Sequence, residues 1–492
     1  MRNLPSEPSS PIETAATRLG RALAEKAVAS PGLSAIHALP VPGDAFAARV
    51  ALADASDRTL DVQYYIWHDD ETGLLLFEAL WRAAERGVRV RLLLDDNSTA
   101  GLDEIIATLD AHPNLEVRLY NPLFHRKFRL FNYVTDFRRV NRRMHNKSFT
   151  ADRLATIVGG RNVGNEYFGT GGGAVFADMD VIAAGQAATD VTVAFERHWT
   201  SASAYPVASL LKPAPPGAGG TLESRFREVR ASAGARAYIE QLERSSTLRE
   251  LVEGRLPFEW TTALLVCDDP AKTLDRAGRS DLLLLTALLE AVGRPGTSFD
   301  LVSPYFVPGT KGTDALTALA GRGVAVRVLT NSLSATDVSA VHAGYAKRRG
   351  DLLDRGVRLF ELERSAINVE RPGIRMLSGG SSASLHAKTF AVDRTRLFVG
   401  SFNFDERSAF LNTEMGLLID SPTLANQLAS TFDAGFPGTA YEVRRRNGAR
   451  GLEWIERPPK GGERRLTTEP GTSAAKRALV RFLSLLPIEW ML

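Results

Sequence analysis

The chain has 492 residues, enough for about two to four domains, and 44% of them are apolar. Its 60 lysines and arginines nearly balance 57 aspartates and glutamates, so the net charge of +3 gives no general attraction to nucleic acid. The single cysteine, Cys267, excludes an internal disulfide and any cysteine-based zinc site. The composition therefore predicts a globular protein with a substantial core and excludes disorder throughout.

The two ends of the chain differ from its body. We expect residues 1–39 to form an N-terminal arm with one short helix. The beginning of the chain lacks the apolar core of a secretory signal, so export by that route is not expected. The most apolar run, 282–292, is too short to span a bilayer, so no transmembrane helix is predicted. Residues 444–492 begin as a basic loop and end in an apolar tail, 479–492, which would either dock on the body or lie in a membrane interface.

A strand, a helix and a second strand are expected early in each half of the chain. Strands alternating with helices predict α/β domains whose sheets are covered by helices on both faces. The first set covers 60–66, 74–86 and 88–94, and the second covers 300–307, 313–322 and 324–329. The predicted first domain is 40–205, the second is 256–443, and between them 206–255 combine a proline- and glycine-rich linker with a helical pattern over 222–244.

One pattern of five residues occurs twice, and each residue of the second copy follows its counterpart by the same number of positions. Five coincident spacings make chance a poor explanation, so the chain contains an internal repeat. The copies are His145, Lys147, Asp152, Gly159 and Asn162, and then His386, Lys388, Asp393, Gly400 and Asn403.

The repeated residues suit phosphate chemistry. In each copy the histidine and lysine are two positions apart on an expected strand, 384–392 in the second copy, so both side chains project from one face. Histidine can attack phosphorus, and lysine can neutralise the phosphate oxygens. A metal site is less favoured, because the lysine would repel a cation. A tight turn follows, and the predicted phosphate-binding residues there are Gly160, Asn162, Ser401 and Asn403.

A lone histidine on a strand is more often a structural residue than a catalytic one. The duplicated spacing reverses this expectation for His145 and His386 alone. The structural interpretation applies to His37, His68, His112, His125, His198 and His342.

The repeated motif resembles the signature of the phospholipase D superfamily: His-Xaa-Lys, four residues, Asp, and then Gly-Gly-Arg-Asn or Gly-Ser-Phe-Asn. The resemblance implies two phospholipase D-like α/β/α domains, related by a pseudo-twofold axis and sharing one active site. It also implies a phosphohistidine intermediate and no metal or other cofactor. One histidine would be the nucleophile and the other the general acid and base, and we favour His145 as nucleophile and His386 as acid.

Several longer stretches resemble bacterial cardiolipin synthases, especially the branch called cardiolipin synthase C. They are 60–67, 88–96, 141–149, 397–404, 411–416 and 483–490. This resemblance implies a phosphatidyltransferase that makes cardiolipin from phosphatidylglycerol and a second phospholipid.

The same resemblance assigns roles to the acidic residues. An acid downstream of each histidine orients it, and Glu414 matches that position in the second half. Asp178 is the equivalent in the longer first half, with Asp180 as its rival. Asp152 and Asp393, the acids of the two His-Lys-Asp sets, are implied to anchor loops at the domain interface.

Aromatic and basic residues are interleaved over 123–143. Such a mixture suits an anionic lipid surface or single-stranded nucleic acid, or it is a loop packed on the body with a solvated basic face. The near-neutral charge and the cardiolipin-synthase-like stretches favour lipid, so no nucleic-acid partner is expected. We therefore predict a peripheral protein on the cytoplasmic face of the cytoplasmic membrane. The predicted membrane-facing residues are Phe128, Phe131, Arg138, Arg139, Arg142 and Arg143.

Three classes of function remain. A phosphatidyltransferase or a phospholipase D-type hydrolase is favoured, and a nuclease of the same superfamily is the second choice. A non-catalytic lipid-binding protein is disfavoured, because every expected histidine and lysine is present.

Overall fold

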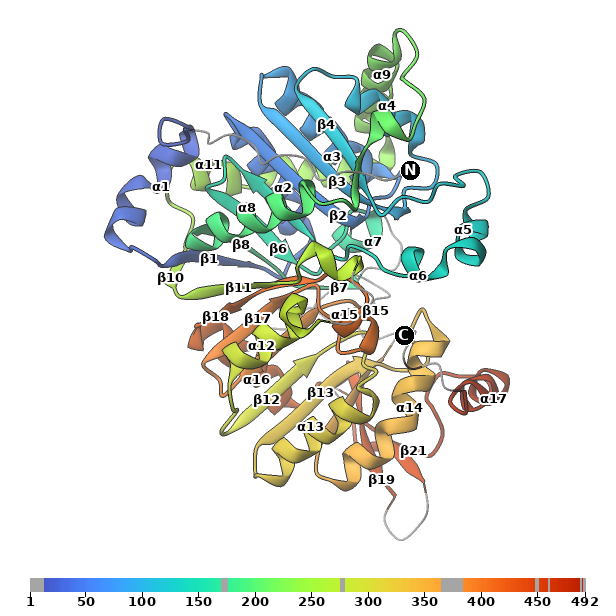
Figure 1. The fold of residues 1–492 in the computed structure, drawn as a ribbon. Coiled ribbons are helices and arrows are strands. Elements are labelled where there is room, and N and C mark those ends of the chain that lie inside the picture. Colours follow the sequence, from blue (N-terminus) through green and yellow to red (C-terminus); the bar gives the residue numbers. More distant parts are fainter. Residues whose placement is uncertain are drawn as a thin grey trace.

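The computed structural model describes residues 13–169, 176–274, 279–363, 384–446, 451–458, 461–486 and 489. Part of the expected N-terminal arm, 1–12, and part of the expected tail, 487, 488 and 490–492, lie outside these residues. The molecule consists of two α/β halves stacked on each other, each built on its own sheet (Figure 1). The expected class, two α/β domains, is confirmed.

The first domain contains a nine-stranded mixed sheet. In spatial order its strands are β10 (Glu259–Thr261), β1 (Ser34–Leu39), β8 (Asp180–Gly185), β6 (Ala155–Gly159), β5 (Ser148–Ala151), β2 (Thr59–Ile66), β3 (Arg89–Ser98), β4 (Leu115–Tyr120) and β9 (Ala204–Pro206). The neighbours β2, β3 and β4 are parallel, as helical crossovers require, and the other neighbours are antiparallel. A buried bidentate ion pair joins Asp61 on β2 to Arg91 on β3, at 2.7 and 2.8 Å.

The second domain repeats this topology and extends it at one edge. Its strands are β11 (Ala263–Cys267), β18 (Met415–Ile419), β17 (Arg396–Gly400), β16 (Lys388–Val392), β12 (Ser298–Val302), β13 (Ala325–Asn331), β14 (Arg358–Leu362), β19 (Ala440–Arg445), β20 (Leu452–Glu456) and β21 (Arg464–Leu466). Strands β12, β13 and β14 are again parallel. Asp300 and Arg327 repeat the buried bidentate pair between the first two of them.

Helices cover both sheets. The first domain and the linker carry α1 (Arg18–Ala29), α2 (Pro42–Ala55), α3 (Glu71–Glu85), α4 (Asp103–Asp110), α5 (Arg129–Thr135), α6 (Phe137–Val140), α7 (Asn165–Phe168), α8 (Gln186–Trp199), α9 (Ala218–Ala231), α10 (Ala233–Arg244) and α11 (Thr247–Val252). The second domain carries α12 (Leu284–Val292), α13 (Gly309–Gly321), α14 (Ser339–Asp354), α15 (Glu406–Phe410), α16 (Pro422–Ala434) and α17 (Ala474–Leu483).

The two domains share an apolar core. Val158 on β6 and Val181 on β8 belong to the same buried cluster as Val399 on β17 and Leu417 on β18. A short parallel pair, β7 (Phe176–Ala177) with β15 (Ser384–Leu385), also crosses between the domains. Burial of this cluster removes apolar surface of both sheets from water, so it holds the two halves in one relative position.

Three boundaries differ from the sequence expectation. Residues 34–39 form β1, paired with β8 and β10, so the expected N-terminal arm contributes a strand to the first sheet. Residues 452–456 and 464–466, expected as loop, form β20 and β21 at the edge of the second sheet, where one-sided burial allows many charged residues. The expected helix 222–244 is broken at Ser232, whose hydroxyl caps α10 by accepting from the Ala235 N–H.

Asp152 and Asp393 anchor loops, but not at the domain interface. Asp152 accepts from the backbone N–H groups of residues 57, 58 and 59, and Asp393 accepts from those of residues 296, 297 and 298. In the described chain, every hydrogen bond of these two carboxylates stays within one domain, so the interface location is wrong. The carboxylates hold the start of β2 and of β12, because three adjacent N–H donors there need a partner.

We expect Asp152→Ala to leave these N–H groups, of which that of Thr59 is buried, without their carboxylate partner and to lower the free energy of unfolding by about 3 kcal/mol. Urea denaturation followed by circular dichroism measures the effect. The control is Asp314→Ala on α13, since Asp314 is 65% exposed and should be neutral. Turnover per folded molecule should stay near the wild-type value, and a selective loss of turnover with unchanged stability would place Asp152 in the chemistry instead.

Candidate active site

The two copies of the repeated motif meet between the domains. His145 follows α6 and precedes β5, while His386 lies between β15 and β16. The strand expected over 384–392 is interrupted at His386 and Ala387, because both of their backbone N–H groups donate to the carbonyl of Ala177 in the other domain. The interruption allows the histidine to face the other half of the protein.

Each histidine is held by a carboxylate from the opposite domain. Nδ1 of His145 lies 2.8 Å from Oε2 of Glu414, and Nδ1 of His386 lies 2.6 Å from Oδ2 of Asp178. The sequence pattern paired each acid with the histidine of its own half, so this part of the expectation is wrong. In the structure, each acid instead contacts the histidine of the other domain.

Backbone contacts impose this exchange. Met144 forms a parallel bridge with Thr413, and the His145 N–H donates to the Thr413 carbonyl at 2.8 Å. Leu385 pairs in the same way with Ala177. The residue after Thr413 is Glu414 and the residue after Ala177 is Asp178. Each backbone pairing between the domains therefore places an acid next to the histidine of the other domain.

Two further residues fix the segments that carry the histidines, and the sequence analysis missed both. Asp95, in the C-terminal part of β3, accepts from the Met144 N–H at 2.8 Å. Asn331, at the end of β13, accepts from the Leu385 N–H at 2.9 Å. Each clamps the residue immediately before a catalytic histidine candidate. Both residues follow an apolar stretch at matching places in the two halves, and this pattern could have identified them from the sequence.

Asp178, and not its rival Asp180, reaches a histidine. Asp180 forms buried ion pairs with Arg49 and Arg161, at 2.9 and 3.2 Å. Gly160 makes room for Asp178, since a Cβ at residue 160 would lie 2.2 Å from Oδ1 of that carboxylate. In the second half Ser401 occupies the matching position, and its hydroxyl donates to Glu414.

The lysines lie beside the histidines and are buried with them. Lys147 Nζ donates to the His145 carbonyl at 2.6 Å, and Lys388 Nζ lies 3.0 Å from Nδ1 of His386. Burial lowers the pKa of Lys147 well below its ordinary value and that of Lys388 to about 8, against the opposing effect of nearby carboxylates. A bound phosphate would raise the pKa of both amines, because an anion favours their protonated form.

The two histidines share one electrostatic environment. Burial, together with Lys147, Lys388 and His386, lowers the pKa of His145 well below its ordinary value, so cations of both halves act on one imidazole. Burial and Lys388 lower the pKa of His386 to about 4, although Asp178 opposes them.

The two carboxylates differ in their charge state. Burial raises the pKa of Glu414 to about 7, against the effect of Lys147. Burial also acts to raise the pKa of Asp178, but His386 and Lys388 outweigh it and hold that pKa below its ordinary value. At neutral pH, Asp178 therefore carries a full charge while Glu414 titrates.

Two tyrosines line the histidines and were not singled out from the sequence. The ring of Tyr65 meets His145 edge to face with centroids 4.9 Å apart, and Tyr167 meets His386 in the same way at 5.1 Å. Tyr65 lies in the aromatic stretch that ends β2, which was the available signal.

The two predicted phosphate-binding asparagines differ in their contacts. Asn162 accepts from the Ile66 N–H at 3.2 Å and donates to the Tyr167 hydroxyl at 3.0 Å, so its side chain positions the tyrosine. The Oδ1 atom of Asn403 is buried without a hydrogen-bond partner among the described residues.

The predicted membrane-facing residues divide into two groups. Arg143 is 1% exposed and pairs with Asp95 at 3.1 Å, so its assignment to the membrane is wrong: its charge neutralises a buried carboxylate. Arg139 and Arg142 lie half-buried against carbonyls of the body. The exposed members are Phe128, Phe131 and Arg138.

None of the helices in the described ranges has the length and apolar character needed to cross a bilayer. Within the same ranges, no cluster of three or more His, Cys, Asp or Glu side chains could hold a metal ion.

Comparisons with known proteins agree with this geometry. The family model for the cardiolipin synthase, PLD-like domain matches residues 50–199 and 288–435. Cardiolipin synthase C of Escherichia coli (strain K12) is 46% identical over 96% of this chain and 100% of its own length. Cardiolipin synthase B of the same strain is 26% identical over 75% of this chain and 72% of its own.

A solved structure has the same fold. The phosphatidylserine synthase of Haemophilus influenzae Rd KW20 aligns with a TM-score of 0.58 and 13% identity, covering 96% of this chain and 99% of its own. At this identity the likeness concerns the fold alone. Taken together, the family match, the near-full-length relative and the paired half-sites show that the chain belongs to the phospholipase D superfamily, in the family of cardiolipin synthase, PLD-like domains.

Proposed function

We propose that this protein is a phosphatidyltransferase that makes cardiolipin from phosphatidylglycerol and a second phospholipid through a phosphohistidine intermediate. The observation that carries the proposal is the exchanged pair of histidine–carboxylate contacts, which puts two imidazoles and two lysines into one site. The similarity over nearly the full length to a relative named cardiolipin synthase C supports the lipid substrate.

The reaction would proceed in two displacements. Because Glu414 holds Nδ1 of His145, Nε2 is the atom that attacks phosphorus, and a phosphorus–nitrogen bond forms as the bond to the leaving oxygen breaks. His386 donates a proton to that oxygen. It then takes the proton of a phosphatidylglycerol hydroxyl, whose oxygen attacks the phosphohistidine and releases His145. Lys147 and Lys388 neutralise the phosphate oxygens throughout.

The difference between the two carboxylates supports these roles. A general acid must be protonated before the first step, and an ionised partner stabilises an imidazolium. His386 faces Asp178, which remains ionised, whereas His145 faces Glu414, with a pKa of about 7. Bound phosphodiester adds negative charge to the site, so His386 is the imidazole that would gain a proton first.

We expect His145→Ala and His386→Ala each to lower turnover by roughly three orders of magnitude. They should differ with phosphatidyl-p-nitrophenol, whose leaving group needs no proton. There, His386→Ala should give a burst of nitrophenol and accumulate a phosphoramidate on His145, since the second step still needs a base. His145→Ala should give no burst. Rapid-quench kinetics and peptide mass spectrometry at alkaline pH measure both results.

Two findings would contradict the assignment. A modified peptide that contains His386 would reverse the roles of the two histidines. Near-wild-type turnover in either variant, with circular dichroism showing an intact fold, would remove the covalent mechanism.

With labelled phosphatidylglycerol, alone or mixed with phosphatidylethanolamine, we expect labelled cardiolipin as the main product. The yield should be unchanged after treatment with EDTA, because lysines supply the positive charge that a metal would provide. Thin-layer chromatography separates the products. Phosphatidic acid as the main product would establish hydrolysis instead, and loss of activity that a divalent cation restores would establish a metal requirement.

The protein would act as a peripheral membrane protein on the cytoplasmic face, and its substrates require an anionic bilayer contact. Helix α5 and its flanks provide one, because they expose large apolar side chains next to cations. Leu130 is 82% exposed, Val134 81%, Phe128 78% and Phe131 50%. Arg138 is exposed beside them. Helix α6 follows at once and leads to His145, so lipid held here would enter the site directly.

Replacing Phe128, Leu130 and Val134 together with asparagine should weaken sedimentation with phosphatidylglycerol vesicles by roughly tenfold or more. Activity on a short-chain, monomeric phosphatidylglycerol should stay within about twofold of wild type, because these side chains touch no part of the site. Binding of the wild type should also weaken as salt rises. Equal losses on vesicles and on the monomeric lipid would show that α5 shapes the active site instead.

A further inference from the structure

We propose that α17 is a second membrane contact, which inserts one apolar face into an anionic bilayer while α5 does so in the first domain. The inference rests on the peripheral membrane location proposed above. It adds a contact from the second domain, so that the bilayer would be held on both sides of the active site.

The outward face of α17 has the composition of an interfacial helix. Leu479 is 49% exposed and Phe482 59%, and their spacing of three places them on one side of the helix, while Leu486, beyond the end of the helix, is 36% exposed. Leu485, in the turn that follows, is 79% exposed. Residues 474–486 contain three cations and no acid, so the charge of this segment complements anionic lipid.

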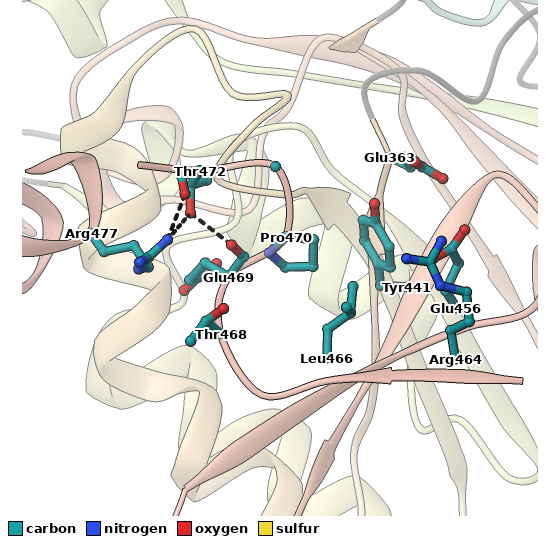
Figure 2. Close-up of a pocket in the computed structure, with 11 residues that line it drawn as sticks. Glu363, Tyr441, Glu456, Arg464, Leu466, Thr468, Glu469, Pro470, Thr472 and Arg477 are labelled. Atoms are coloured by element: carbon teal, nitrogen blue, oxygen red, sulfur yellow. Dashed lines mark hydrogen bonds and ion pairs between the residues drawn. The ribbon is translucent and has the colours of Figure 1, made fainter. Parts of the chain in front are cut away.

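The opposite face of α17 is fixed to the protein. Val480 is buried in a small cluster with Leu333 and Ala343, and Leu483 packs against it. The loop that leads into the helix is held by an ion pair between Glu469 and Arg349. Figure 2 shows this loop, in which the Arg477 guanidinium donates to Thr472, along the edge of a polar cavity of about 530 Å³. Because the Val480 face packs on the domain, Leu479 and Phe482 remain exposed on the outside of the helix.

Helices α5 and α17 hold equivalent places in the two halves. Arg129, the first residue of α5, and Arg126, just before the helix, bind Asp96. Asp96 follows Asp95, which holds the His145 segment. Val480 of α17 packs on Leu333, two residues after Asn331, which clamps the His386 segment. Each helix thus contacts the region, the C-terminal part of β3 or the turn after β13, that holds one of the two histidine segments.

The two helices lie on the same side of the molecule in the view of Figure 1. There α5 is at the right-hand margin of the first domain and α17 at the right-hand margin of the second. A flat bilayer could therefore touch both helices at once. Two contacts bind a membrane far more firmly than one, because the second then forms at high effective concentration.

The test compares variants on vesicles of phosphatidylglycerol and phosphatidylcholine. Leu479→Asn, Phe482→Asn and Leu485→Asn together should weaken sedimentation by roughly tenfold or more, and combination with the α5 variant should abolish it. The matched control carries Val193→Asn on α8 and Leu289→Asn on α12, which are 50% and 62% exposed. This control should bind like the wild type.

A second measurement separates this inference from the proposed function. Activity of the α17 variant on monomeric short-chain phosphatidylglycerol should equal that of the wild type. If neither protein acts on this lipid, that result would contradict the proposed function and not the membrane contact. Unchanged vesicle binding by the α17 variant would overturn the membrane contact. A change in molar mass by light scattering, with vesicle binding intact, would show that a second copy of the chain covers this face and would overturn it as well.

Discussion

His145 and His386 are each hydrogen-bonded at Nδ1 to a carboxylate of the other domain. The imidazole and the carboxylate of each pair stabilise each other only while the two domains keep their relative position, because separation would leave each group without its hydrogen-bond partner. The shared core of β6, β8, β17 and β18 therefore serves the chemistry directly. Two backbone pairings between the domains, at Thr413 and Ala177, fix where the carboxylate oxygens of Glu414 and Asp178 lie.

Much of the fold could be predicted from the sequence, because repeated spacing and alternating strands and helices depend on local pattern. The βαβ units around β2 and β12 were of this kind, and so was the pairing of each histidine with a lysine two residues on. Strand β1 and the edge strands β20 and β21 were missed, because short strands at the margin of a sheet have only weak apolar alternation.

The residues that were misplaced depend on contacts distant in sequence. Glu414 and Asp178 were found as acids, but which histidine each one meets is decided by the domain interface, and no local pattern encodes that. Arg143 shows the same limit. It stands in a basic, aromatic run that is typical of a membrane surface, yet it neutralises Asp95, which is 48 residues earlier in the chain.

The close approach of Gly160 to Asp178 limits how the two halves can diverge. Any side chain at residue 160 would occupy the space of the carboxylate, whereas Ser401, at the matching position, holds the longer Glu414 in place. If Asp178 were replaced by glutamate, or Glu414 by aspartate, the turn residue that contacts it, Gly160 or Ser401, would therefore have to change as well. Substitutions at these positions would be compatible only in pairs within one half, residue 160 with residue 178 and residue 401 with residue 414, so each half of the duplicated chain carries its own epistatic constraint.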